Sequence, residues 1–367
     1  MLGLREIRRR RVQFALIGVV IALISYLVLM VNGLGTGLND RAGSALRGLD
    51  ADALAYAANA DLSVIRSELS EARVVQIGAD LVPATAAPLG YFGINTRTTS
   101  GRIESAALLG VRPDTIAAPV AREGRALTAD DRRALLADLG FLRAAGVDIG
   151  DEIALIARGR EETYRIVGAV DEGSFFFQPT VYVLLDSLRE LKYGRIDATT
   201  PLASVVLLQA DGIPASATAA YDVVDLDTAF ANIEGVAGQQ ATVNALRFFG
   251  YLIGALVIGI FFYVLTLQKI AQTGLLKAIG ASSGYVFRQL LLQVMVVSTA
   301  GVAIAIPLAV LTERLLARSP DGVPIAFRTS DYLLTAVLLV VMGLVGAAFS
   351  LRQITRLDPI IALGRQE

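Results

Sequence analysis

Four long apolar stretches divide the sequence, and a long segment of mixed polar and apolar character separates the first stretch from the second. The apolar stretches run over residues 13–33, 245–267, 290–311 and 332–351. At about 1.5 Å per residue, a helix over each stretch is long enough to cross a hydrocarbon core of about 30 Å. The pattern therefore predicts four transmembrane helices.

A basic N-terminal tail, residues 1–12, stands before the first apolar stretch and carries Arg5 and Arg8 to Arg11. Signal peptides share this arrangement, but the apolar stretch here is longer than the apolar core of such a peptide. A glycine-containing flexible exit, residues 32–35, follows without a convincing cleavage site. We expect an uncleaved anchor whose N-terminus is cytoplasmic.

Residues 34–244 have the pattern of a water-exposed α+β domain, with charges, turns and short β-rich runs. Apolar positions at helical spacing between residues 128 and 145 predict one amphipathic helix with Thr128 as its N-cap. Buried strands are predicted over residues 153–157, 164–170, 180–185 and 203–208, with a polar loop over 158–163 between the first two. The expected fold class is a membrane α-helical protein with one large extracytoplasmic α+β domain inserted between helices 1 and 2.

Basic residues next to the later apolar stretches predict the topology. Lys269, Lys277 and Arg288 lie in the loop 268–289, and the C-terminal tail 352–367 also carries arginines. Because cytoplasmic segments of membrane proteins are enriched in lysine and arginine, both segments are predicted to be cytoplasmic. The segment 312–331 is then a short extracytoplasmic loop.

The composition supports a membrane location and excludes several classes of function. Of the 367 residues, 54% are hydrophobic, and the mean hydropathy of +0.58 is high for a soluble protein. A net charge of −1 creates no field that would attract nucleic acid. Cysteine and histidine are absent, which removes disulfides, thiol nucleophiles, imidazole bases and most intrinsic metal sites. No nucleophile is paired with a base, so we expect no catalytic residues.

The cytoplasmic loop holds the candidate element for mechanical coupling. The sequence lacks the G-x-x-x-x-G-K-[ST] phosphate loop, so we expect a partner to bind ATP and supply the energy. Leu275, Leu276 and Ile279 can form an apolar ridge on a short helix that ends at Gly280. From composition alone, an amphipathic connector at the membrane surface is an equal alternative.

Residues 268–280, QKIAQTGLLKAIG, lie between two membrane helices and resemble the coupling-helix segment of the permeases typified by the macrolide exporter and the division protein FtsX. Residues 357–363, LDPIIAL, are similar to the D-P-x-x-A-L ending of that family. The order of one helix, a large outside domain and three helices is also the family's. The resemblance implies a permease subunit of an ABC transporter, coupled to its ATPase through Gln272, Thr273, Gly274, Leu275, Leu276, Lys277, Ala278, Ile279 and Gly280.

Within this family, residues 261–280 are most similar to the HrtB-type permeases of haem exporters. That resemblance implies two copies of this chain with two copies of an HrtA-like ATP-binding subunit, which holds ATP and Mg. It also implies haem as the substrate, moved out of the outer leaflet of the cell membrane. Composition and spacing show no substrate by themselves.

Without histidine or cysteine, haem iron can be ligated here only by tyrosine, methionine, a carboxylate or, less readily, lysine. Tyr26 and Met30 are four residues apart and share a helix face, so they can line a slot open to lipid. The full set of candidate substrate residues is Tyr26, Met30, Glu234, Asn244, Arg247, Phe248, Phe249 and Tyr251. Arg247 or Asn244 would receive a propionate, and Glu234 would offer an oxygen ligand. Interfacial anchoring, helix packing and a solvated Glu234 are the alternatives.

Three further alternatives stay open at the level of sequence. The aromatic run Phe175-Phe176-Phe177 fits either a lip that touches lipid or substrate, or a hairpin buried in the domain. The chain can be a signalling permease of the FtsX kind, which transports nothing and controls an extracytoplasmic enzyme. It can also export lipid, lipoprotein or peptide instead of haem.

Overall fold

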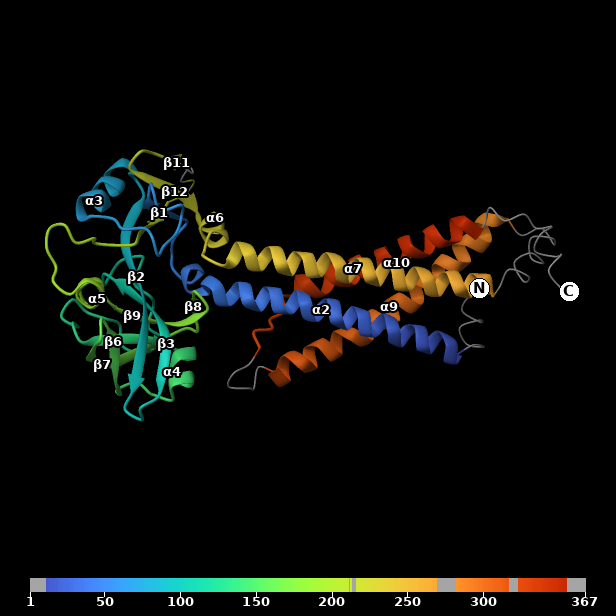
Figure 1. The fold of residues 1–367 in the computed structure, drawn as a ribbon, viewed down its shortest axis with the longest axis horizontal. Coiled ribbons are helices and arrows are strands. Elements are labelled where there is room, and N and C mark those ends of the chain that lie inside the picture. Colours follow the sequence, from blue (N-terminus) through green and yellow to red (C-terminus); the bar gives the residue numbers. More distant parts are fainter. Residues whose placement is uncertain (1–10, 211, 213–215, 269–281, 317–322, 355–367) are drawn as a thin grey trace. The chain divides into compact units, whose positions relative to one another are not determined.

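Two units make up the chain: residues 1–37 together with 241–367, and Leu38–Gln240 (Figure 1). The computed structural model describes residues 11–210, 212, 216–268, 282–316 and 323–354. The first unit holds the apolar helices, and the second holds all the described strands. The predicted fold class, apolar helices with a large α+β domain inserted after the first of them, is confirmed.

Long helices form the first unit: α2 (Arg11–Arg47), α7 (Val236–Leu267), α9 (Ser283–Leu316) and α10 (Thr329–Ile354). Among the residues that the structure describes, three helices are long and apolar enough to cross a membrane, over Arg11–Arg47, Val236–Leu265 and Phe287–Leu316. The fourth predicted span lies in α10, whose described apolar part, Thr329–Val345, is shorter.

Apolar side chains lie both inside and outside this helical unit. Ile21, Ile258 and Val294 are buried together at the contact of α2, α7 and α9. Leu16 and Leu23, on the same helix as Ile21, are exposed, as are many leucines and valines of the other helices. Helices that are apolar on their outer surface are suited to lipid, because their backbone polar groups are already paired internally.

The first helix does not end in a flexible exit after residue 31, as the sequence predicts, but continues to a kink at Gly43, after which helical residues run on to Arg47. Its glycines serve close packing instead. A methyl group on Gly33 would lie 2.4 Å from the Phe327 ring, and one on Gly37 would lie 2.1 Å from the backbone oxygen of Pro324. A side chain at either position would collide with the segment before α10, so here glycine permits contact rather than flexibility.

The second unit, the outside domain, begins with the end of α2 and adds strands and short helices. These are β1 (Ala53–Ala57), α3 (Glu71–Asp80), β2 (Thr85–Thr98), β3 (Ile103–Val111), β4 (Glu123–Gly124), β5 (Ala134–Asp138), α4 (Leu139–Ala145), β6 (Glu152–Ala157), β7 (Arg160–Val170), β8 (Ser174–Phe175), β9 (Gln178–Leu184), α5 (Leu185–Tyr193), β10 (Val205–Gln209), β11 (Ser216–Ala217), β12 (Tyr221–Asp225) and α6 (Leu226–Ala231).

Strand pairing closes part of the outside domain into a barrel. The order runs β11-β12-β1-β10-β2-β3-β9-β5-β7-β4, and β6 pairs with both β2 and β7. The strands β2, β3, β9, β5, β7 and β6 therefore form a closed ring, which leaves no unpaired edge along it. Besides β3, the long β2 pairs with two other strands: its first residues pair with β10 and its last residues pair with β6.

The strands predicted over 153–157, 164–170, 180–185 and 203–208 are confirmed as β6, β7, β9 and β10. The polar loop predicted over 158–163 is wrong, because β7 already begins at Arg160. Only Arg158 and Gly159 form the turn, and both have positive φ, 53° and 72°. Two consecutive residues with positive φ are what a tight two-residue hairpin requires.

The single helix predicted over 128–145 is also wrong. Thr128 donates its backbone N–H to Asp131 Oδ2 at 2.7 Å in a turn, and the chain then forms strand β5 before the short helix α4. All five residues of β5 are buried, and its two faces pack into different hydrophobic clusters, Ala134 and Leu136 into one and Leu135 and Ala137 into the other. A short apolar run buried on both faces cannot be told from a helix by periodicity.

Candidate functional site

Tyr26 and Met30, the predicted pair on the first helix, do share a face. Both are partly buried and pack against Ala305 and Ala309 of α9. The Tyr26 hydroxyl lies 3.0 Å from the Thr312 hydroxyl, where either can donate the hydrogen bond. In this structure the tyrosine oxygen and the methionine sulfur thus belong to the contact between α2 and α9.

Tyr251 and Arg247 of α7 gather around Asn32 of α2. The Asn32 side-chain amide donates to the Tyr251 hydroxyl at 3.2 Å and to the Thr335 hydroxyl at 2.8 Å. Arg247 donates to the backbone oxygen of Asn32 and to the side-chain oxygen of Asn244, each at 3.4 Å. Three of the predicted residues are therefore brought together, and their centre is Asn32, which the sequence pattern does not single out.

Phe248 and Phe249 are not part of this group. Their side chains are 61% and 56% exposed, and their rings meet edge to face with centroids 5.5 Å apart. Exposed aromatic rings on a membrane helix face lipid or another protein. Within the described helices, the two phenylalanines therefore do not close over Tyr251.

Glu234 lies in the outside domain, and the alternative of a solvated carboxylate is wrong. The Ser63 hydroxyl donates to Glu234 Oε1, whereas Oε2 is buried without a hydrogen-bond partner among the described residues. Burial raises the pKa of Glu234, and the nearby charge of Arg66 lowers it less. Burial, followed by the charge of Glu234, also raises the pKa of Tyr91 to about 12. The carboxyl group thus stands at the rim of an apolar and aromatic core.

The aromatic run 175–177 forms the turn of a hairpin between β8 and β9, which agrees with the buried alternative. Phe175 is fully buried and contacts the rings of Phe176 and Tyr91 with centroids 4.4 and 5.2 Å apart. The backbone N–H groups of Phe176 and Phe177 donate to carbonyl oxygens of the α2 end, Ala42 at 2.9 Å and Arg41 at 3.0 Å. The hairpin therefore caps the helix that enters the outside domain.

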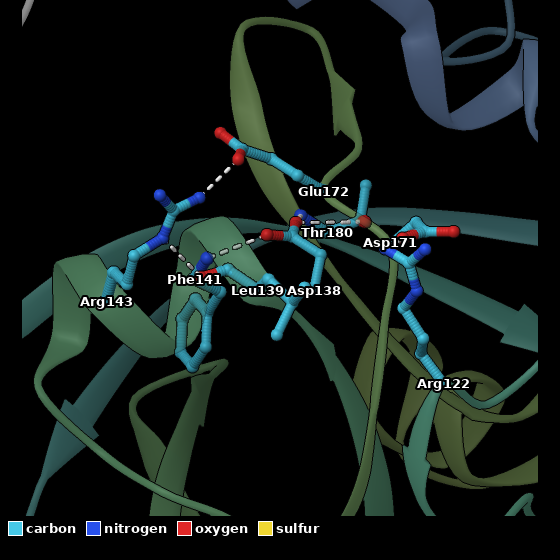
Figure 2. A network of polar contacts seen from close by, with 8 residues as sticks. All are labelled: Arg122, Asp138, Leu139, Phe141, Arg143, Asp171, Glu172 and Thr180. Carbon is cyan, nitrogen blue, oxygen red and sulfur yellow. Dashed lines mark hydrogen bonds and ion pairs between the residues drawn. The ribbon is translucent and has the colours of Figure 1, made fainter. Parts of the chain in front are cut away.

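A polar network holds the base of this hairpin (Figure 2). Asp138 caps α4 by accepting the Phe141 N–H at 2.7 Å, and it also accepts from the backbone and hydroxyl of Thr180. Arg143 pairs with Glu172 directly before the hairpin. Burial raises the pKa of Asp138 to about 6, although its hydrogen bonds with N–H groups act in the opposite direction. An Asp just before a short helix is the signal that could have identified this cap.

The predicted coupling residues, Gln272 to Gly280, lie outside the described residues. Over the part of the chain that the structure does describe, no three carboxylates gather as ligands for a metal ion. The polar groups buried or partly buried in the described helices are amides, hydroxyls and a guanidinium, which can bind and orient a solute but supply no nucleophile paired with a base.

These features define the class: a multi-pass membrane protein with an extracytoplasmic α+β domain and polar groups buried between its helices. Residues 244–359 match the family described as FtsX-like permease C-terminal. This part of the chain therefore resembles the FtsX-like permeases, and the chain is similar to ABC transporter permeases of the FtsX type.

Similarity to individual proteins extends over the whole chain. A protein named as hemin transport system permease protein HrtB, from Staphylococcus haemolyticus, is 25% identical over 100% of this chain and 99% of that protein. The uncharacterised ABC transporter permease Rv2563 of Mycobacterium tuberculosis is 24% identical over 99% of this chain and 98% of that protein. The periplasmic region of MacB from Actinobacillus actinomycetemcomitans aligns with 50% of this chain and 92% of that structure, at 16% identity and a TM-score of 0.35.

Proposed function

We propose that this chain is the permease subunit of an ABC exporter that moves haem out of the cell membrane. The similarity to a protein named as a hemin permease, over the full length of both chains, carries the proposal. Buried polar groups between apolar helices support it, because a polar residue within a membrane bundle is costly unless it has a functional or structural task.

Energy comes from a separate ATPase of the HrtA kind, two copies of which act on two copies of this chain. The cytoplasmic loop 268–289 receives the force, and both termini are cytoplasmic. Replacing the apolar Leu276 with a charged residue, Leu276→Asp, is expected to abolish the stimulation of ATPase activity by haemin in the purified complex. Asp130→Ala, at an exposed polar position of the outside domain, serves as the control. Unchanged stimulation in Leu276→Asp would remove this loop as the coupling element.

Haem is held by aromatic, thioether and oxygen-bearing side chains, because the chain has no histidine or cysteine. We assign Tyr26, Met30 and Glu234 as alternative iron ligands, each to be tested separately. Arg247 with Asn244 receives a propionate. Phe248, Phe249 and Tyr251 supply aromatic surface for the macrocycle.

The test is a spectroscopic titration of the purified permease in detergent with haemin. The wild type is expected to shift the Soret band, and the shift is expected to weaken when the true ligand is replaced in Tyr26→Phe, Met30→Leu or Glu234→Gln. Tyr263→Phe is the matched control, because Tyr263 lies twelve residues beyond Tyr251, about 18 Å along the same helix.

A wild type that produces no Soret shift, together with a complex that still hydrolyses ATP, would contradict haem export. That result would favour a signalling permease or an exporter of lipid, lipoprotein or peptide. Protection of a haem-sensitive bacterium by the permease and its ATPase, compared with the ATPase alone, checks the same proposal in cells.

A further inference from the structure

Asn32 is a strongly polar residue at a position where an apolar one would be expected. It lies on α2, a helix apolar enough to cross a membrane, and only 7% of its surface is exposed. Its amide reaches α7 through Tyr251 and α10 through Thr335. Three apolar helices thus meet at one amide group.

The hydrogen bonds of this amide are incomplete. Its nitrogen donates to both hydroxyl groups, but Oδ1 is buried and has no partner among the described residues. Rotating the amide by 180° would let the oxygen accept from the hydroxyl groups and would leave the nitrogen without a partner instead. In either orientation, one polar atom of the Asn32 amide has no partner and can bind a group that is not part of the described chain. An apolar bundle offers no solvent to satisfy it.

The hydrogen bonds of the Arg247 guanidinium are also incomplete. Its two terminal nitrogens make only long hydrogen bonds, of 3.4 Å, to the Asn32 backbone oxygen and to Asn244. Its Nε is buried without a partner, and no ion pair with a carboxylate forms among the described residues. A partly buried guanidinium without an anion is costly, and a carboxylate is the group that fits it best.

The two unsatisfied groups belong to the same cluster, since Arg247 bonds to the backbone of the residue whose amide is incomplete. Close packing keeps them together. A methyl group on Gly35 would lie 2.6 Å from Val243 Cγ1 and 2.9 Å from Arg247 Nη2, so the glycine lets the guanidinium lie against α2. The cluster is therefore held in place from both helices before any ligand arrives.

We propose that Asn32, Arg247 and Tyr251 form the carboxylate-recognition point of the transporter. Arg247 pairs with a carboxylate of the amphiphilic substrate, and Asn32 is the positioning residue that holds the Tyr251 hydroxyl and the guanidinium in place. This inference rests on the proposed export of haem, which carries two propionates, and it adds a criterion for the substrate. The transporter then recognises a free carboxylate of the haem macrocycle as well as the haem iron.

The experiment compares binding of haemin and haemin dimethyl ester by the purified full-length permease. The two probes share iron and macrocycle and differ only in the carboxylates. The wild type is expected to prefer the free acid, and Arg247→Gln is expected to reduce the acid-to-ester affinity ratio roughly ten- to hundredfold, the value of one charge-assisted hydrogen bond. Asn32→Leu is expected to reduce the ratio by a similar or smaller factor, and Asn32→Ser to retain part of it.

Ser25→Ala is the matched control, because Ser25 is equally buried on α2, about two turns away, and its hydroxyl also lacks a partner among the described residues. It is expected to leave the ratio unchanged. Partition of the probes into detergent is common to all variants and cancels in the comparison. Thermal unfolding of each variant separates a change of the ratio from a loss of fold.

The outcomes separate the two proposals. A wild type that binds neither probe contradicts haem export itself. A wild type that binds both probes with equal affinity leaves haem binding intact but overturns the carboxylate-recognition point. An acid-to-ester ratio that stays at the wild-type value in Asn32→Leu and falls only in Arg247→Gln removes the role assigned to Asn32.

Discussion

The buried cap of α4, Asp138, makes the stability of the outside domain depend on pH in an unusual direction. Burial raises the pKa of this carboxyl group from 3.8 to about 6. Because the pKa of Asp138 is higher in the folded state than in the unfolded state, protonation of Asp138 favours the folded state. This stabilisation is fully present below pH ~4 and is lost as the pH rises through about 6. Acidification from neutral pH should therefore stabilise the structure around Asp138.

The size of the effect follows from the shift. About two pKa units correspond to roughly 3 kcal/mol between the fully protonated and fully ionised limits. Between pH 7 and pH 4.5, about 2 kcal/mol of this is gained, which is roughly a thirtyfold increase in hydrogen-exchange protection. The measurement is hydrogen exchange with mass spectrometry on the intact chain in detergent, corrected for the intrinsic exchange rate at each pH.

The control is built into the same molecule. Asp225 caps α6 in the same way, by accepting the Thr228 N–H at 2.6 Å, but hydrogen bonding lowers its pKa. Because the folded-state pKa of Asp225 lies below the unfolded-state value of 3.8, its stabilising contribution is lost only below that pH, so protection of α6 should stay nearly constant between pH 7 and pH 4.5 while protection of α4 rises. Protection of α4 that stays equally constant would refute the reasoning, because it would mean that the N–H donors around Asp138 outweigh its burial and keep it ionised.

Two further substitutions test the packing. Gly37→Ala places a methyl group 2.1 Å from the backbone oxygen of Pro324, which should cost about 1–3 kcal/mol of stability. The thermal midpoint of the detergent-solubilised protein should therefore fall. An unchanged midpoint would contradict the close contact. Phe175→Ala removes a fully buried ring and should destabilise the outside domain by about 3–5 kcal/mol in denaturant unfolding, whereas Phe177→Ala, at a position 39% exposed, should cost less than about 1 kcal/mol. Equal effects of the two would mean that the hairpin is not buried as described.

Local composition was sufficient to predict the long apolar helices and four of the strands, β6, β7, β9 and β10. A run such as residues 248–267 carries no charge, and no tertiary contact is needed to recognise it. The strand over residues 134–138 does not follow from local pattern, because its two faces are buried in clusters that gather residues distant in sequence. The glycines after residue 32 look like a flexible exit for the same reason, since the neighbours that they pack against lie more than 200 residues later.

The candidate site was predicted in part. Spacing alone places Tyr26 and Met30 on one face, and the structure brings Asn244, Arg247 and Tyr251 together on α7. The sequence did not reveal Asn32, because a single asparagine beside a glycine is also typical of a helix exit. Only its bonds to α7 and α10 distinguish the two cases.

The hairpin that caps α2 has a mechanical consequence. The final turns of this helix are bonded to Phe176 and Phe177, and Ala42, Ala45 and Leu46 lie within the hydrophobic core of the outside domain. The backbone departs from helical geometry at Gly43, and Ala45 and Leu46, which follow it, belong to this core. A pull on this end of α2 would therefore have to break the bonds to the hairpin before these residues could leave the core of the outside domain.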